Sequence, residues 1–275
     1  MNDQSVARDW QLNIDADLVL RGQGADPAML LTRHPTPRGP RWAANDHFLA
    51  ELFDLRMLLA MQREDLRPFV EHTTTPDLVN GSFLAPLEMT HEVWLVRNPD
   101  RLAAPQRPAL FFKSIGWRAV GQQHPIRIRA DSARHVPEPC VTLIVNQRQE
   151  VVGYTLGNDV TACDLGDLPQ AKIYDGACAL GPALQLMDDD ILPVLSITLE
   201  VVRETRSVLR GEAVLSVDQP QVADWIAWLY REMSFPHGAF LMLGVPLAFP
   251  ADFTLHHGDR VTIASGVLVL ENTVA

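Results

Sequence analysis

The alternation of apolar and polar residues predicts a β-hairpin near the middle of the chain. Two runs rich in β-branched residues, 140–146 and 151–156, are separated by a short polar segment. This pattern is typical of two strands joined by a turn. Because alternate side chains of a strand leave opposite faces, Glu138 and Cys140 are expected on one face of the first strand. Asp159 is expected just past the end of the return strand, where closure of the hairpin brings it near Glu138.

Strands are also predicted on both sides of this hairpin, and Gly181-Pro182 is predicted to form the next turn after it. The runs 195–202 and 207–216 alternate well and are expected to form an antiparallel pair. Strands outnumber helices, so the pattern predicts an α+β, β-rich fold. The remaining predicted strands cover residues 10–20, 92–96, 110–113, 126–129, 240–243 and 259–270.

Two segments carry a helical pattern instead. Apolar residues recur at helical spacing over residues 46–70, and the pattern ends at the Thr-rich, Pro-containing stretch 73–76. A second helix is predicted over residues 222–233, where Asp218 and Gln221 have the spacing of a capping box. The first helix lies in an N-terminal layer, and we expect a small α+β domain at residues 1–85 followed by a β-rich domain at residues 86–275.

Composition and charge restrict the class of protein. The chain has 275 residues, 47% of them hydrophobic, and a mean hydropathy near zero, as in an ordinary globular protein. Its net charge of −11, from 23 basic and 34 acidic residues, argues against nucleic acid or an anionic membrane as a partner. No apolar run is long enough for a membrane helix, and the first residues lack a secretory signal. Three cysteines in that context predict reduced thiols and a cytoplasmic location.

Several short motifs in the middle of the chain resemble those of one known family. They include Glu138-Pro139-Cys140, the stretch 153–159 ending in Asn158-Asp159, and Gln170-Ala171-Lys172. With similar stretches upstream at 108–113 and 128–132 and downstream at 250–255, 258–259 and 270–274, the chain resembles the fumarylacetoacetate hydrolase superfamily. Within that superfamily it resembles the sugar-acid dehydratase branch, typified by 2-keto-3-deoxyarabonate dehydratase.

The resemblance implies a mixed β-roll core, a homodimer, and a divalent-metal enzyme that acts on a small-molecule 2-oxo acid. In this family a Glu-x-Glu pair and the Asp of an Asn-Asp turn bind Mg²⁺, which chelates the substrate and stabilises an enolate. Glu138 and Asp159 match the first and last of these metal ligands. Lys172 matches a lysine that contacts the substrate and is the implied catalytic residue. The residues implied to bind substrate are Lys113, Asn158 and Gln170.

The chain also departs from the family pattern at several points. Cys140 stands where the family has its second glutamate, and Cys163 stands where it has an arginine. The segment between residues 94 and 111, which in the family carries a lid with a catalytic glutamate, is short. A thiol is a soft and largely neutral ligand near its usual pKa of about 8.5, so it suits zinc or another borderline metal better than Mg²⁺. We therefore expect a degenerate site in which Mg²⁺ or another divalent cation binds weakly or not at all.

Three interpretations stay open at this point. The chain is a lyase (dehydratase or decarboxylase) or a C–C hydrolase acting on a 2-oxo acid. Alternatively it is a non-catalytic relative that binds a ligand or an active paralogue, and Lys172 merely bridges Glu138 and Asp159 in a buried ion-pair network. The third interpretation is a pocket repurposed for a different substrate, made more apolar by Val245 and Leu247. Cys163 and Cys178 are interpreted as small core residues.

Overall fold

The computed structural model describes residues 28–79, 81–97, 107–189 and 191–275. The strand predicted at residues 10–20 lies outside these ranges. Within them, no helix combines the length and the apolar character needed to cross a membrane.

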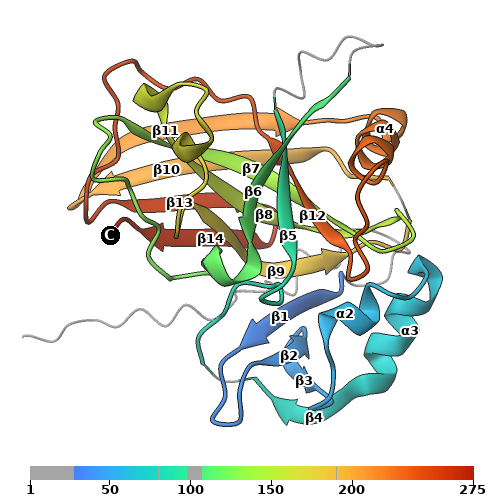
Figure 1. The fold of residues 1–275 in the computed structure, drawn as a ribbon. Helices are drawn as coiled ribbons and strands as arrows, with labels where there is room; N and C mark the ends of the chain where they lie inside the picture. Colours follow the sequence, from blue (N-terminus) through green and yellow to red (C-terminus); the bar gives the residue numbers. More distant parts are fainter. Residues whose placement is uncertain (1–27, 80, 98–106, 190) are drawn as a thin grey trace, which may run out of the picture.

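The largest element is a ten-stranded mixed sheet (Figure 1). The pair β12–β5 is parallel, and every other neighbouring pair in this sheet is antiparallel. In spatial order the strands are β4 (Thr74–Leu78), β3 (His47–Leu49), β2 (Arg41–Ala44), β1 (Leu30–His34), β9 (Cys178–Leu186), β8 (Val151–Ala162), β7 (His135–Val145), β12 (Ala239–Gly244), β5 (Glu92–Arg97) and β6 (Ala109–Ile115).

A four-stranded antiparallel sheet packs on one face of the central strands. Its order is β11 (Arg206–Leu215), β10 (Leu195–Arg203), β13 (Arg260–Ser265) and β14 (Leu268–Thr273). The predicted pairing of the runs 195–202 and 207–216 is confirmed, because β10 and β11 are neighbours in antiparallel register. Apolar residues of both sheets, among them Leu143, Leu156, Ile197 and Ile263, form one core together with the helix α4 (Gln219–Leu229). The α+β, β-rich fold is thereby confirmed.

A second core lies on the other face of the central strands, covered by the helices α2 (Leu55–Leu58) and α3 (Arg63–Thr73). Leu58 and Leu66 of these helices pack with Ile144 of β7 and Phe240 of β12, and all four are at most 2% exposed. Burying a side chain of this size contributes about 1.5–3 kcal/mol each. The N-terminal strands and helices thus share a core with the main sheet. The division into domains at residues 85 and 86 stays a prediction.

The prediction of a single helix over residues 46–70 is wrong. The segment forms β3 and then the two short helices, with Asp54 capping α2 by accepting a hydrogen bond from the Arg56 backbone N–H at 2.8 Å. An apolar pattern cannot by itself separate a short buried strand from a helical turn, and here pairing with β2 draws residues 47–49 into the sheet. The predicted end of the pattern is confirmed, because α3 stops at Thr73.

Three other predictions need correction. Residues 126–129 do not form a strand and contribute only an isolated bridge between Ile126 and Val274. Gly181-Pro182 is not a turn, because both residues lie inside β9, joined by a cis peptide bond. The helix predicted at 222–233 is present as α4 but begins at Gln219, and the side chain of its N-cap residue, Asp218, makes no capping hydrogen bond.

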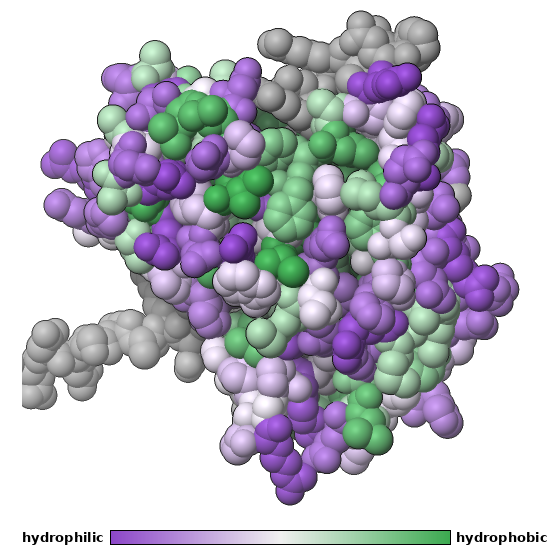
Figure 2. All heavy atoms as spheres, in the orientation of Figure 1, coloured by the Kyte–Doolittle hydropathy of each residue, from purple (hydrophilic) through white to green (hydrophobic). Residues whose placement is uncertain are grey.

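The outer face seen in Figure 2 mixes both classes of side chain, with hydrophobic patches set among hydrophilic residues. The exposed large hydrophobic side chains include Trp117, Val208 and Val214. Single exposed hydrophobic residues are common on soluble proteins, so only a patterned group carries information about binding.

Candidate functional site

The hairpin β7–β8 holds the two carboxylates of the candidate site. In its register Glu138 lies directly opposite Asp159, and Cys140 lies opposite Gly157. The predicted proximity of Glu138 and Asp159 is therefore present. The expectation that Asp159 follows the end of the strand is wrong, because β8 continues to Ala162. The two strands pair as far as His135, so the carboxylates face each other within the ladder and not across a turn.

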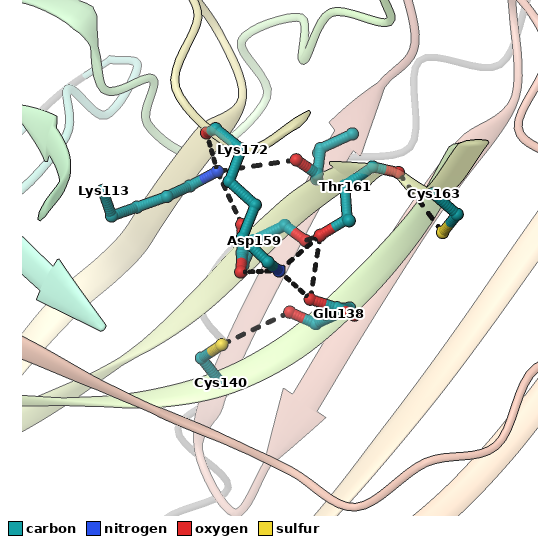
Figure 3. Close-up of polar contacts among 8 residues, drawn as sticks. Lys113, Glu138, Cys140, Asp159, Thr161, Cys163 and Lys172 are labelled. Carbon is teal, nitrogen blue, oxygen red and sulfur yellow. Dashed lines mark hydrogen bonds and ion pairs between the residues drawn. The ribbon is translucent and has the colours of Figure 1, made fainter. Parts of the chain in front are cut away.

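The ammonium group of Lys172 bridges the two carboxylates (Figure 3). Its Nζ atom lies 2.6 Å from Asp159 Oδ2 and 2.6 Å from Thr161 Oγ1, and it also donates to Glu138 Oε2. Lys172 follows directly on the short 3-10 helix η4 (Pro169–Ala171), which turns the chain back towards the hairpin. The side chain of Lys172 is 19% exposed and that of Glu138 is 37% exposed, so this side of the cluster meets solvent.

Lys113 binds Asp159 from the opposite side. Its Nζ atom lies 2.6 Å from Asp159 Oδ1 and donates to the backbone oxygen of Lys172 at 2.5 Å. Three strands separate β6, which carries Lys113, from β8 in the sheet order, so the sheet curls to bring the two together. The side chain of Lys113, which the resemblance implies to bind substrate, is fully buried, so it contacts Asp159 and not solvent.

The surroundings shift the three charged groups in different directions. Burial and the charge of Asp159 raise the pKa of Glu138, although Lys172 acts to lower it. Burial would also raise the pKa of Asp159, but Lys113 and Lys172 hold it below its ordinary value. Burial would lower the pKa of Lys172, but Asp159 and Glu138 keep it above its ordinary value. Asp159 therefore stays ionised and Lys172 stays protonated, and each charge stabilises the other.

Sequence reasoning missed one member of the cluster, Thr161. Its hydroxyl lies between Lys172 and Glu138, donating to Glu138 Oε2 at 2.8 Å. The signal was available, because residues 159 and 161 are two apart on a strand and share a face. The chain contains only two lysines, Lys113 and Lys172, and both lie in this cluster.

Cys140 lies next to the cluster but takes no part in it through a charge. The thiol is fully buried and donates a hydrogen bond to the backbone oxygen of Glu138 at 3.4 Å. Burial raises the pKa of Cys140 well above its ordinary value, so the side chain is a neutral thiol at physiological pH. Cys178 is also buried, whereas Cys163 is partly exposed, and the thiol of Cys163 lies 3.7 Å from the backbone oxygen of Thr161.

These donors do not fit Mg²⁺. Mg²⁺ requires several hard oxygen ligands in near-octahedral geometry. Here the negative charges of Glu138 and Asp159 are already matched by the positive charges of Lys113 and Lys172, and the next side chain on the same face is a protonated thiol. Over the described ranges, no group of three or more His, Cys, Asp or Glu side chains is arranged to hold a metal ion.

Two predicted substrate-binding residues lie away from the cluster. Asn158 neighbours Asp159 on β8, so its side chain points to the opposite face, where it is fully buried and its amide atoms have no hydrogen-bond partner among the described residues. Gln170 is exposed, and its backbone oxygen accepts a hydrogen bond from Arg129 at 3.3 Å. Two adjoining cavities of about 640 and 540 Å³ lie beside Arg129, and neither is lined by Glu138, Asp159 or Lys172.

The fold and this cluster define a class of protein, and comparison with known proteins names it. The chain belongs to the fumarylacetoacetate hydrolase family: the family model described as "Fumarylacetoacetate (FAA) hydrolase C-terminal" matches residues 79–275. The chain is 35% identical over 163 residues to the 2-dehydro-3-deoxy-D-arabinonate dehydratase of Saccharolobus solfataricus, covering 57% of this chain and 55% of that protein. It is 33% identical over 176 residues to a probable 2-keto-3-deoxyxylonate dehydratase of Haloferax volcanii, covering 61% of this chain and 60% of that protein.

A solved structure supports the same assignment. The 2-keto-3-deoxy-D-arabinonate dehydratase complexed with magnesium and 2,5-dioxopentanoate has a TM-score of 0.72 and 25% identity to this chain, covering 90% of this chain and 98% of that one. The family thus includes a protein that binds a divalent cation together with a small 2-oxo acid. The aligned regions span little more than half the length of the two sequence relatives.

Proposed function

We propose that this protein is a lyase, either a dehydratase or a decarboxylase, or a C–C hydrolase, and that it binds a small 2-oxo acid at the Lys172 ammonium group. The observation that carries the proposal is the placement of Lys172. It is a fixed cation on a largely buried cluster, and it remains 19% exposed next to the partly exposed Glu138. The two dehydratase relatives and the neighbour with 2,5-dioxopentanoate support a 2-oxo acid as the ligand class.

In this proposal Asp159 and Lys113 have a supporting role, and Lys172 contacts the substrate. Asp159 and Lys113 form the buried base of the site and keep Lys172 charged and oriented. Lys172 donates hydrogen bonds to the substrate carboxylate and to the adjacent oxo oxygen. Negative charge that develops on that oxygen is stabilised by a cation already in place, which costs no reorganisation during the reaction. Asn158 and Gln170 stay predictions as substrate-binding residues.

We further propose that Mg²⁺ binds weakly or not at all. The metal position expected from the family lies between Glu138 and Asp159, and Lys172 occupies that position here. A divalent cation would have to displace an ammonium group held by two carboxylates. The neutral thiol of Cys140 would offer it little in return.

The second candidate function is a non-catalytic relative that binds a ligand or an active paralogue. The specific observation in its favour is that Lys172 already satisfies both carboxylates, which leaves Glu138 and Asp159 no open metal position. The homodimer and the cytoplasmic location expected from the sequence are likewise proposals.

Elemental analysis and a substrate screen distinguish these functions. We expect purified protein to carry less than stoichiometric metal and to turn over oxaloacetate or a 2-keto-3-deoxy sugar acid, with the turnover lost in Lys172→Met. Arg127→Met is the matched control, because this arginine is exposed and lies in the cavity that the cluster does not line. Ligand binding without turnover by the wild-type protein would favour the non-catalytic function. Unchanged turnover in Lys172→Met would contradict the proposed role of Lys172.

A further inference from the structure

The strand β11 forms one edge of the four-stranded sheet (Figure 1). Nine of its ten residues pair with β10 on one side, and Val208 is bulged out of this ladder. On the other side, over the ranges that the structure describes, no backbone hydrogen bond reaches it. An edge of this length presents a row of free N–H and C=O groups, and natural proteins usually block such edges with Pro, Lys or a very short strand. β11 contains neither Pro nor Lys, and its one β-bulge lies near its start at Val208, so residues 209–215 form a regular free edge.

The opposite edge of the same sheet, β14, is closed by its own chain. Gln123 and Ile126 donate backbone hydrogen bonds to the backbone oxygens of Glu271 and Thr273, at 2.8 and 2.9 Å. The side chain of Gln122 accepts a further hydrogen bond from the Glu271 backbone N–H at 2.7 Å. The fold therefore covers one edge of this sheet and leaves the other, β11, free to pair.

The sequence of β11 is complementary to itself. Residues 208–214 read Val-Leu-Arg-Gly-Glu-Ala-Val, with Gly211 at the centre. When two antiparallel copies of a strand are related by a two-fold axis, residues equally far from the axis lie opposite each other. An axis at Gly211 places Arg210 opposite Glu212, and Leu209 opposite Ala213, each pair occurring twice. Opposite charges are among the cross-strand pairs that stabilise antiparallel sheets.

Moving the axis by one residue removes this match. An axis at Arg210 sets this arginine against its own copy, and an axis at Glu212 sets this glutamate against its own copy, so each places like charges opposite each other. The self-complementarity therefore selects one register and not antiparallel pairing in general.

The side chains in question are available for such pairing. Val214 is 56% exposed. Arg210 is exposed and makes no ion pair within the described part of the chain, and the Glu212 carboxylate accepts one hydrogen bond, from Ser196 at 3.0 Å. Residues 210, 212 and 214 share one face of the strand because they alternate along it, and the bulge at Val208 ends this alternation.

We propose that β11 pairs with β11 of a second copy of this chain about a two-fold axis at Gly211, which joins the two four-stranded sheets into one continuous sheet. This inference specifies the surface of the homodimer proposed above. It does not depend on the activity, and its failure would leave the proposed role of Lys172 untouched.

Charge reversal tests the register. We expect sedimentation of the full chain to show a dimer, and Arg210→Glu or Glu212→Arg to raise the dimer dissociation constant at least about five-fold, because each change sets like charges opposite each other twice. The double swap Arg210→Glu with Glu212→Arg should restore the wild-type value. The matched control is Arg206→Glu, which makes the same change of charge on the same strand but lies beyond the bulge at Val208, outside the residues 209–213 that this register pairs. A protein that stays monomeric at every concentration overturns the proposal, as does a dimer that neither single reversal weakens or that the double swap fails to restore.

Disulfide trapping tests the same register without relying on charge. In a Cys163→Ser background, the combined substitutions Leu209→Cys and Ala213→Cys should give a dimer on non-reducing gels, because the register sets each new thiol opposite the other position in the partner. Either substitution alone in that background should leave the chain uncrosslinked, since Cys140 and Cys178 are buried. Equal crosslinking in the single variants, or none in the double variant, would overturn the proposed register.

Discussion

Lys113 Nζ lies 2.6 Å from Asp159 Oδ1, and both side chains are almost completely removed from solvent. Removing one partner of a buried ion pair leaves an uncompensated charge and typically costs about 3–5 kcal/mol. We therefore expect Lys113→Met to lower the free energy of unfolding, measured in denaturant, by about that amount. The control is Arg38→Met, which breaks an exposed pair with Glu51 at 2.8 Å and should cost at most about 1 kcal/mol. Equal losses in the two variants would contradict this role for the buried pair.

The buried His91 predicts a loss of stability in mild acid. Burial lowers the pKa of His91 to about 4, although its hydrogen bond to the His237 backbone oxygen acts to raise it. Between pH 6.5 and 4 the unfolded state binds more protons than the folded state, so the free energy of unfolding should fall by roughly 3 kcal/mol as the pH drops through this window. Above pH 6.5 this histidine should not make the free energy of unfolding depend on pH. Chemical unfolding at several pH values should show a flatter dependence in His91→Gln, and identical slopes in the two proteins would rule out this assignment.

Replacing Cys140 by glutamate should strengthen Mg²⁺ binding. The new carboxylate would leave the same strand face as Glu138, opposite Gly157, and would add a hard oxygen ligand beside Asp159. We expect calorimetry to show at least about a ten-fold gain in affinity, equivalent to about 1.4 kcal/mol, over the wild-type protein. Cys140→Ser keeps the size of the side chain without the carboxylate and should show no gain. A low-micromolar dissociation constant for Mg²⁺ in the wild-type protein would contradict the weak binding proposed above.

The two lysines of the chain should differ in their reaction with amine-directed reagents. Lys172 is 19% exposed and Lys113 is fully buried, so peptide mass spectrometry of the folded protein should find the label on Lys172. Its raised pKa keeps most of the amine protonated, so labelling should be slow at neutral pH and faster towards the raised pKa. Oxaloacetate should slow the labelling of Lys172 if a 2-oxo acid binds there. Labelling of both lysines at one rate would contradict the buried position of Lys113, and the absence of protection would count against the proposed ligand.

The hairpin β7–β8 could be predicted because its signals are local. Two β-branched runs and a polar turn define it, and the period of two along each strand places Glu138 and Cys140 on one face. The same period would have placed Thr161 beside Asp159. The resemblance to the family then supplied Lys172, and the structure shows its ammonium group on both carboxylates.

Other features depend on contacts that no local pattern contains. The curl of the sheet brings Lys113 from β6 to Asp159, across three intervening strands. Residues 47–49 have a helical spacing of apolar side chains but pair with β2, so tertiary pairing overrides the local pattern. Residues 126–129 alternate like a strand, yet Ile126 makes one bridge to Val274, and its backbone serves to cover the edge of β14.

The junction between β1 and β9 has a consequence for folding during synthesis. The two strands meet at Leu30 with Gln185 and Leu31 with Leu184, pairs that lie more than 150 positions apart in the chain. At 5–20 residues per second a ribosome needs roughly 8–30 s to make the intervening stretch. During that interval the free edge of β1 has no native partner and is open to association with other chains. Shielding of this newly made strand by a chaperone should therefore raise the yield of folded protein.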